Sequence, residues 1–237
     1  GEGQTTGVIV EKEGYILTST FNFLDKPPII TVILSTGERK IAQMLGRDET
    51  RRLCLLKIES DASLPAAQWV SRDALKVGQW TVALGFGFGE GEPALSAGII
   101  SATHRMGAKA VQTDANLSPA NYGGPLIDIE GNLIGICAPL SPGNSNAAAG
   151  AEWYDSGIGF AVPLPPKEKV YQALREGKTL VAGFLGVQTK ALADYQPGAQ
   201  ILKVIDKSGA AEAKLKEQDV IASVGGTMAL DPTHLAA

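Results

Sequence analysis

The stretch that decides the fold is QTDANLSPANYGGPL, residues 112–126. A β-prone run ends at Thr113, a loop containing Asn and Pro follows, and Gly123 and Gly124 precede a second β-prone run that begins at Pro125. Glycine adopts backbone conformations that strain other residues, so this pair marks a tight passage into the second run. The stretch is typical of a sharp loop between two strands.

The rest of the chain continues this pattern. Its 28 glycines and 13 prolines separate short apolar and β-branched runs, which is typical of a barrel or sandwich of many strands. The runs predict strands over residues 7–12, 15–19, 29–35, 40–47, 53–59, 80–84, 95–103, 110–113, 125–129, 133–137 and 157–162.

A change of pattern follows at residues 165–176, where two prolines open a helical segment and Gly177 lies just past its end. Residues 184–187, 199–204 and 219–224 then predict strands, and residues 209–215 predict a short helix. Residues 140–155, rich in Gly, Ser, Asn and Ala, predict a mobile loop.

Composition excludes several functional classes. The net charge is only -4, which argues against a general binder of nucleic acid or of anionic membranes. No apolar run approaches the roughly 20 residues that span a bilayer, so no transmembrane segment is expected. The glycine-rich residues 85–89 lack the helix and spacing of a nucleotide-binding loop, and no cofactor is predicted.

The two cysteines, Cys54 and Cys137, lie in separate apolar runs and outside any C-x-x-C motif. This favours buried free thiols over a zinc site or a disulfide scaffold, and no metal site is predicted. A disulfide between the two remains an alternative.

The quoted stretch, together with residues 15–18, 53–58, 131–136 and 157–163, resembles the HtrA (DegP-like) branch of the trypsin-like serine proteases. The resemblance implies an all-β fold of two orthogonal six-stranded barrels, residues 1–79 and 80–164, with a cleft between them. A linker helix, residues 165–180, and a truncated α/β unit similar to a PDZ domain, residues 181–237, follow. In that unit Phe184, Leu185, Gly186 and Val187 match the loop that binds a peptide carboxylate.

The same resemblance implies that the catalytic residues are replaced. The position of the general-base histidine holds Phe21, that of the orienting aspartate holds Arg52, and that of the nucleophilic serine holds Tyr122. A serine hydroxyl attacks a carbonyl only when an imidazole takes its proton and a carboxylate orients that imidazole. Losing triad members costs on the order of 10⁶ in turnover, so cleavage by this site is not expected.

Other residues offer no clear replacement for the triad. Only two histidines exist, and His104 is expected at the surface end of a strand while His234 lies near residue 237. Asp48 is expected to be a turn carboxylate. Ser118 has no activating Lys or His beside it in the sequence and is expected to be a loop hydroxyl.

If the barrel geometry is kept, Phe21, Arg52 and Tyr122 converge where the triad would meet. We expect Arg52 to stack on the two rings, in a structural plug worth about 1 kcal/mol. The backbone of Ala120, Asn121 and Tyr122 is expected to form an oxyanion-type loop, which binds an anion without starting acyl transfer.

The sequence therefore predicts an inactive HtrA-type pseudoprotease that binds peptides or unfolded protein segments by strand addition. The alternatives are an active serine endopeptidase, through rearranged residues or a domain outside these 237 residues, and a structural module that forms homo-oligomers. No nucleic-acid partner is expected. The compartment is unknown, and a periplasmic or exported location is implied by the resemblance alone.

Overall fold

The computed structural model describes residues 4–25, 27–86, 92–141, 154, 156–192, 196–224 and 227–228. The contacts divide the chain into two units, Gly1–Val181 and Ala182–Ala237, which are described separately. His234, most of the loop predicted over residues 140–155 and the last three of the glycine-rich residues 85–89 lie outside the described residues.

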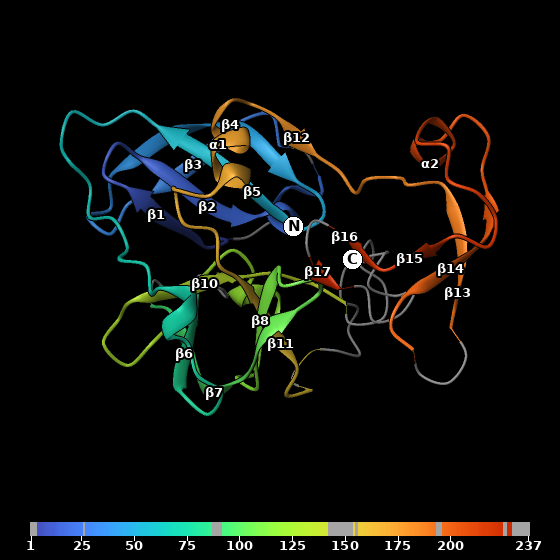
Figure 1. The fold of residues 1–237 in the computed structure, drawn as a ribbon. Helices are drawn as coiled ribbons and strands as arrows, with labels where there is room; N and C mark the ends of the chain where they lie inside the picture. The colour runs from blue at the N-terminus through green and yellow to red at the C-terminus, as the bar shows by residue number, and fades with distance from the viewer. Residues whose placement is uncertain are drawn as a thin grey trace. The chain divides into compact units, whose positions relative to one another are not determined.

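The first unit begins with a curled six-stranded sheet (Figure 1). Its order is β1-β2-β5-β4-β12, and β3 also pairs with β4. Leu17 and Leu55 pair across β2 and β5 and are fully buried, because side chains of one strand face alternate sides and these face the core. The strands are β1 (Gly7–Glu11), β2 (Tyr15–Ser19), β3 (Ile30–Ile33), β4 (Arg39–Asp48), β5 (Leu53–Ile58) and β12 (Thr179–Leu180).

A closed six-stranded barrel forms the rest of the first unit, in the order β10-β11-β8-β7-β6-β9. Its inward residues are small or apolar, and the buried hydroxyls of Thr81 and Thr113 bond each other at 3.0 Å. The strands are β6 (Trp80–Gly85), β7 (Ala94–Arg105), β8 (Ala110–Thr113), β9 (Pro125–Ile127), β10 (Leu133–Cys137) and β11 (Gly159–Val162). The all-β, trypsin-like double-barrel fold expected from the sequence is confirmed.

The segment predicted as a linker contributes to the first sheet. Helix α1 (Lys169–Arg175) is shorter than predicted, and β12, which the sequence did not reveal, pairs in parallel with β4. Tyr171 and Leu174 on α1 are fully buried, and the Tyr171 hydroxyl donates to Glu11 on β1. A Cβ at Gly46 of β4 would lie 2.4 Å from the backbone oxygen of Leu174, so only glycine permits this close packing.

The second unit contains a three-stranded sheet, β13-β14-β15, and a hairpin, β16-β17. The strand predicted over residues 184–187 is wrong, since β13 begins only at Val187. Gly186 has a φ of +79°, which is outside the extended region, so no strand runs through residues 184–187. The strand predicted over residues 219–224 is two short strands. The elements are β13 (Val187–Ala191), β14 (Ala199–Val204), α2 (Gly209–Glu212), β15 (Val220–Ile221), β16 (Ser223–Val224) and β17 (Thr227–Met228).

Three short 3-10 helices were not expected from the sequence: η1 (Thr20–Phe23), η2 (Arg72–Ala74) and η3 (Pro119–Asn121). Single turns of this kind carry too little periodicity to be recognised in a sequence. Two of them, η1 in the first sheet region and η3 in the second barrel, position the candidate site. Among the residues that the structure describes, no helix is long and apolar enough to cross a membrane.

Candidate functional site

The 3-10 helix η1 positions Phe21. The hydroxyl of Ser19 accepts a hydrogen bond from the backbone N–H of Phe21 at 3.2 Å, which caps the turn. That hydroxyl also donates to the carbonyl oxygen of Arg52 at 3.0 Å, and Thr20 N donates to the same oxygen at 2.9 Å. The backbone of Arg52 is therefore held beside η1.

The 3-10 helix η3 positions Tyr122. The buried side chain of Asn121 turns back, and its Oδ1 accepts from the backbone N and the hydroxyl of Ser118, at 3.0 and 3.3 Å. Ser118 is thus a loop hydroxyl that closes the turn. Gly123 follows with a φ of +89°, a conformation that favours glycine and sends the chain back into the barrel.

These two turns bring Phe21 and Tyr122 into direct contact. Their ring centroids are 5.3 Å apart with an interplanar angle of 74°, an edge-to-face arrangement that aromatic pairs favour. Tyr154 extends the cluster, with its ring 6.4 Å from that of Tyr122. Phe21 and Tyr122, two of the three residues expected to converge, thus lie in contact, and Tyr154 adds a ring that the sequence did not indicate.

Burial governs the chemistry of Tyr122, which is only 4% exposed. Desolvation raises the pKa of its phenol well above the usual value, and the neighbouring Tyr154 and Cys137 act in the same direction. The phenol therefore stays protonated at neutral pH. A protonated phenol without a base to take its proton is a poor nucleophile.

Asn22 ties the two barrels together beside this cluster. Its Nδ2 donates to the hydroxyl of Thr18 and to the carbonyl oxygen of Tyr122, both at 3.0 Å. The Thr18 hydroxyl in turn donates to the carbonyl oxygen of Thr6 at 2.6 Å. Sequence reasoning missed Asn22, and its only signal was a polar residue between two phenylalanines at the end of a strand.

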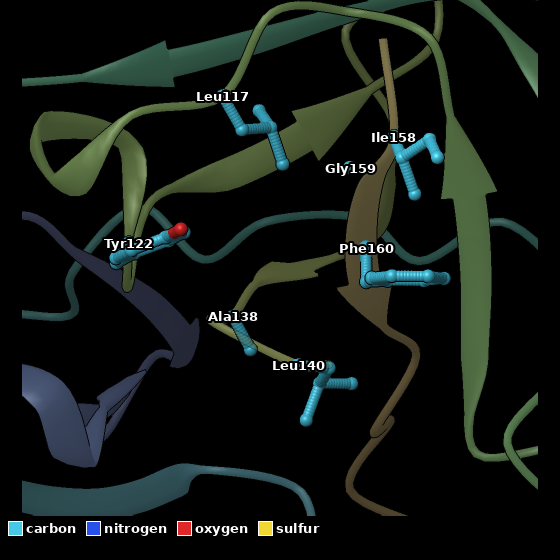
Figure 2. A pocket seen from close by; sticks show the side chains of 7 residues that line it. All are labelled: Leu117, Tyr122, Ala138, Leu140, Ile158, Gly159 and Phe160. Atoms are coloured by element: carbon cyan, nitrogen blue, oxygen red, sulfur yellow. The ribbon is translucent and has the colours of Figure 1, made fainter. Parts of the chain in front are cut away.

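A small hollow lies next to Tyr122 in the second barrel (Figure 2). Figure 2 shows the ring of Tyr122 on one side and residues of the β11 segment on the other. The lining residues are Leu117, Tyr122, Ala138, Leu140, Ile158, Gly159 and Phe160. The centre of a water molecule has only about 10 Å³ available there, which is room for about one water. The pocket is nearly filled.

The loop predicted to hold an oxyanion, Ala120 to Tyr122, uses its donors internally. Asn121 N donates to the Ser118 oxygen at 2.9 Å, and Tyr122 N donates to the Pro119 oxygen at 3.3 Å. The following N–H, of Gly123, donates to the Cys137 oxygen at 2.8 Å. An anion would bind to the Asn121 and Tyr122 N–H groups only after the 3-10 turn opened.

The remaining charged candidates lie in separate environments. Nη1 of Arg52 is 4.0 Å from the carboxylate of Glu49, and stacking of Arg52 on the two rings stays a prediction. Asp48 is a turn carboxylate, as predicted. It accepts from both the N–H and the hydroxyl of Thr50 and from Nη1 of Arg51, at 2.9, 2.7 and 2.9 Å.

His104 is exposed on β7, and its Nδ1 lies 2.9 Å from the hydroxyl of the adjacent Thr103. The structure therefore gives it a local partner at the surface, as expected. Cys54 and Cys137 are free and buried, which excludes a disulfide between them. Desolvation raises the pKa of each thiol to about 12, so both are inert at neutral pH.

In the second unit, the predicted carboxylate-binding loop is partly exposed. Phe184 and Leu185 are 72% and 40% exposed, and Gly186 is buried, with room for no Cβ beside Ser208. The carbonyl oxygens of Leu185 and Gly186 accept from Ala210 N and Ile205 N at 2.9 and 2.8 Å. Carboxylate binding by Phe184, Leu185, Gly186 and Val187 stays a prediction.

Comparison with known proteins adds three findings. The family model of the trypsin-like peptidase domain matches residues 5–136. The periplasmic serine endoprotease DegP of Escherichia coli K12 is 36% identical over 238 residues, which cover 93% of this chain and 48% of that protein. The periplasmic pH-dependent serine endoprotease DegQ of the same organism is 33% identical, and the match covers 95% of this chain and 51% of that protein. The chain thus spans about half the length of these relatives.

Comparison with solved structures leads to the same family. The HtrA-type protease AlgW with decapeptide superposes with a TM-score of 0.75 at 30% identity, covering 97% of this chain and 72% of that one. The structure of AlgW with tripeptide gives the same TM-score at 32% identity, and the match covers 95% of this chain and 76% of that one. At this identity and coverage the likeness concerns the family as well as the fold.

Proposed function

We propose that this chain, which belongs to the HtrA-type branch of the trypsin-like peptidase family, does not cleave peptide bonds and acts by binding peptides or unfolded protein segments. The observation that carries the proposal is the contact between Phe21 and Tyr122, 5.3 Å apart, at the positions where the family motif has histidine and serine. Two aromatic rings occupy the place of a base and its nucleophile.

The chemistry supports the loss of cleavage. Acyl transfer needs a hydroxyl, a base to accept its proton and donors for the oxyanion. Tyr122 is a buried and protonated phenol, Phe21 carries no titratable group, and the N–H of Tyr122 already donates to Pro119. These three losses concern different steps, so restoring one of them does not restore the reaction.

Peptide binding is supported by the second unit. Within the described residues, β13 pairs with β14 alone, which leaves its other edge available for strand addition. The exposed side chains of Phe184 and Leu185 lie directly before this strand in the chain. The relatives AlgW with decapeptide and AlgW with tripeptide are complexes with peptides, and we propose the same class of partner here.

The test of lost cleavage is incubation with unfolded casein and with a fluorophosphonate probe that labels active serines. DegP serves as the active control. We expect neither cleavage nor labelling. The proposal would be overturned by casein turnover that persists through repeated purification and is abolished in Tyr122→Phe, because such turnover would show that the site is catalytic.

The test of binding uses a fluorescein-labelled apolar decapeptide with a free carboxylate and the same peptide with an amidated end. We expect saturable binding that Phe184→Ser and amidation both weaken, because the loop is proposed to hold the carboxylate. Ile129→Ser is the matched control, since Ile129 is an equally exposed apolar residue in the first unit. A peptide affinity that neither Phe184→Ser nor amidation changes contradicts this part of the proposal.

A further inference from the structure

Strand β3 presents an open edge in the first sheet (Figure 1). Among the residues that the structure describes, β3 pairs with β4 alone. Residues 29–34 read IITVIL, an apolar, β-prone run without a charged residue. Natural edge strands usually carry charges, prolines or bulges that discourage pairing with another chain, and this run has none.

The hydrogen bonds show which backbone groups face outward. Leu34 N donates to the Glu38 oxygen at 2.9 Å, so Leu34 and Glu38 form a hydrogen-bonded pair. Val32 pairs with Lys40 and Ile30 pairs with Ala42, two and four residues further along the same ladder. Hydrogen-bonded pairs alternate along an antiparallel ladder, so these residues direct their N–H and C=O groups to β4. The N–H and C=O groups of Thr31 and Ile33 therefore face the open edge, and Ile29 comes immediately before the strand.

The same three residues expose their side chains. Ile29 and Ile33 are 65% and 47% exposed, and Thr31 is exposed between them. Ile41, which pairs with Thr31 across β3 and β4, is 75% exposed on the same face. Four neighbouring side chains, three of them isoleucines, thus form an apolar strip along an edge that also offers unpaired backbone groups.

We infer that β3 pairs with β3 of a second copy of this chain, antiparallel and about a two-fold axis at Thr31. In this register Ile29 lies opposite Ile33 of the second copy and Thr31 lies opposite Thr31. The outward N–H and C=O groups of Thr31 then face those of Thr31 in the second copy, and the pairing continues to Ile33 opposite Ile29, because hydrogen-bonded pairs recur at every second residue. Isoleucine against isoleucine is a favourable cross-strand pair.

Charge does not oppose this pairing. Arg39 pairs with Ile33 inside one copy and lies two residues from Ile41, so it is a charged residue on the face of the strip. The two-fold axis places the two Arg39 residues at opposite ends of the paired strands, about four residues or roughly 13 Å apart along the strands and further apart in space, because two β3 strands lie between them. That exceeds the screening length at physiological ionic strength, so their repulsion is small.

The size of the contact sets its strength. A stable dimer buries about 800 Å² on each partner, and two strands of five residues offer less. The pair therefore forms at high protein concentration and dissociates on dilution. A single short strand pairing of this kind is independent of the proposed peptide binding by the second unit.

Sedimentation velocity across micromolar to submillimolar concentrations tests the inference. We expect a monomer at low concentration and a dimer at high concentration. Amide hydrogen exchange at Ile29, Thr31 and Ile33 should slow as the dimer forms, while the amides of Ile30 and Val32, which already bond β4, should not change.

Two variants remove the contact in different ways. Thr31→Pro deletes an outward N–H, which a folded edge strand tolerates, and Ile33→Lys places a charge in the strip. Both should remain folded monomers at every concentration, whereas Leu95→Lys, at a 67% exposed residue of the second barrel, should still dimerise. A wild-type chain that stays monomeric, or a dimer that survives both variants or is lost in Leu95→Lys, overturns the inference.

Discussion

The side-chain amide of Asn22 donates to the carbonyl oxygen of Tyr122 at 3.0 Å, and the ring of the preceding residue packs on the ring of Tyr122. One turn of η1 thus contacts both the backbone and the side chain of Tyr122. The conformation of a loop in the second barrel depends in this way on two adjacent residues near the first sheet. These contacts form the core of the candidate site.

Removing the amide should weaken the whole first unit. Asn22→Ala leaves the Tyr122 carbonyl oxygen without this donor at the junction of the two barrels, and we expect a loss of about 1–3 kcal/mol in the free energy of unfolding. Urea denaturation measures it. Gln43→Ala, at an exposed residue of β4, is the control, and an equal effect of the two substitutions would contradict the role given to Asn22.

Gly123 should tolerate no side chain. A Cβ there would lie 2.3 Å from the Thr18 hydroxyl and 2.4 Å from the Thr6 oxygen, in addition to the strain of a φ of +89°. Gly37→Ala separates the two costs, because Gly37 has a φ of +84° and nothing within 4 Å of an added Cβ. We expect about 1–2 kcal/mol for Gly37→Ala and clearly more for Gly123→Ala. Similar losses on urea denaturation would show that the loop moves aside.

The buried thiols make stability fall at alkaline pH. Burial raises the pKa of Cys54 and Cys137 to about 12, whereas an unfolded thiol ionises near pH 8.5. Between these values the unfolded chain releases protons that the folded chain retains, so the free energy of unfolding decreases as pH rises. The loss is on the order of 2 kcal/mol for each thiol at pH 10.

Comparison with the double variant Cys54→Ala, Cys137→Ala isolates this contribution from lysines and tyrosines. The difference in free energy of unfolding between the two proteins should shift in favour of the variant as pH rises from about 8 to 10. Urea denaturation at several pH values measures it. A difference that does not change with pH would mean that the thiols are accessible in the folded protein.

Restoring the three family side chains should not restore cleavage. In the triple variant Phe21→His, Arg52→Asp, Tyr122→Ser, the backbone N–H at position 122 still donates to the Pro119 oxygen and not to an oxyanion. Loss of one such donor costs about 10²–10³ in turnover. We expect casein cleavage at least about 100-fold below that of DegP. Cleavage within tenfold of DegP would show that the 3-10 turn opens freely.

The sequence by itself determined the double-barrel fold and most strands, and it carries the family motifs on which the proposed loss of the catalytic residues rests. These features depend on local information: alternating apolar residues, Gly and Pro at turns, and an ordered series of family motifs. The same local information placed Cys54 and Cys137 in the core and Asp48 in a turn, as the structure has them.

Only the tertiary structure decided how Phe21, Asn22 and Tyr122 are arranged. The bond between Asn22 and Tyr122 joins residues 100 positions apart, and the 3-10 turns that orient them are too short to leave a periodic signal. Strand β12 was hidden for the same reason, since two residues become a strand only when β4 lies beside them. Contacts between distant segments depend on packing of the complete chain, which no local pattern encodes.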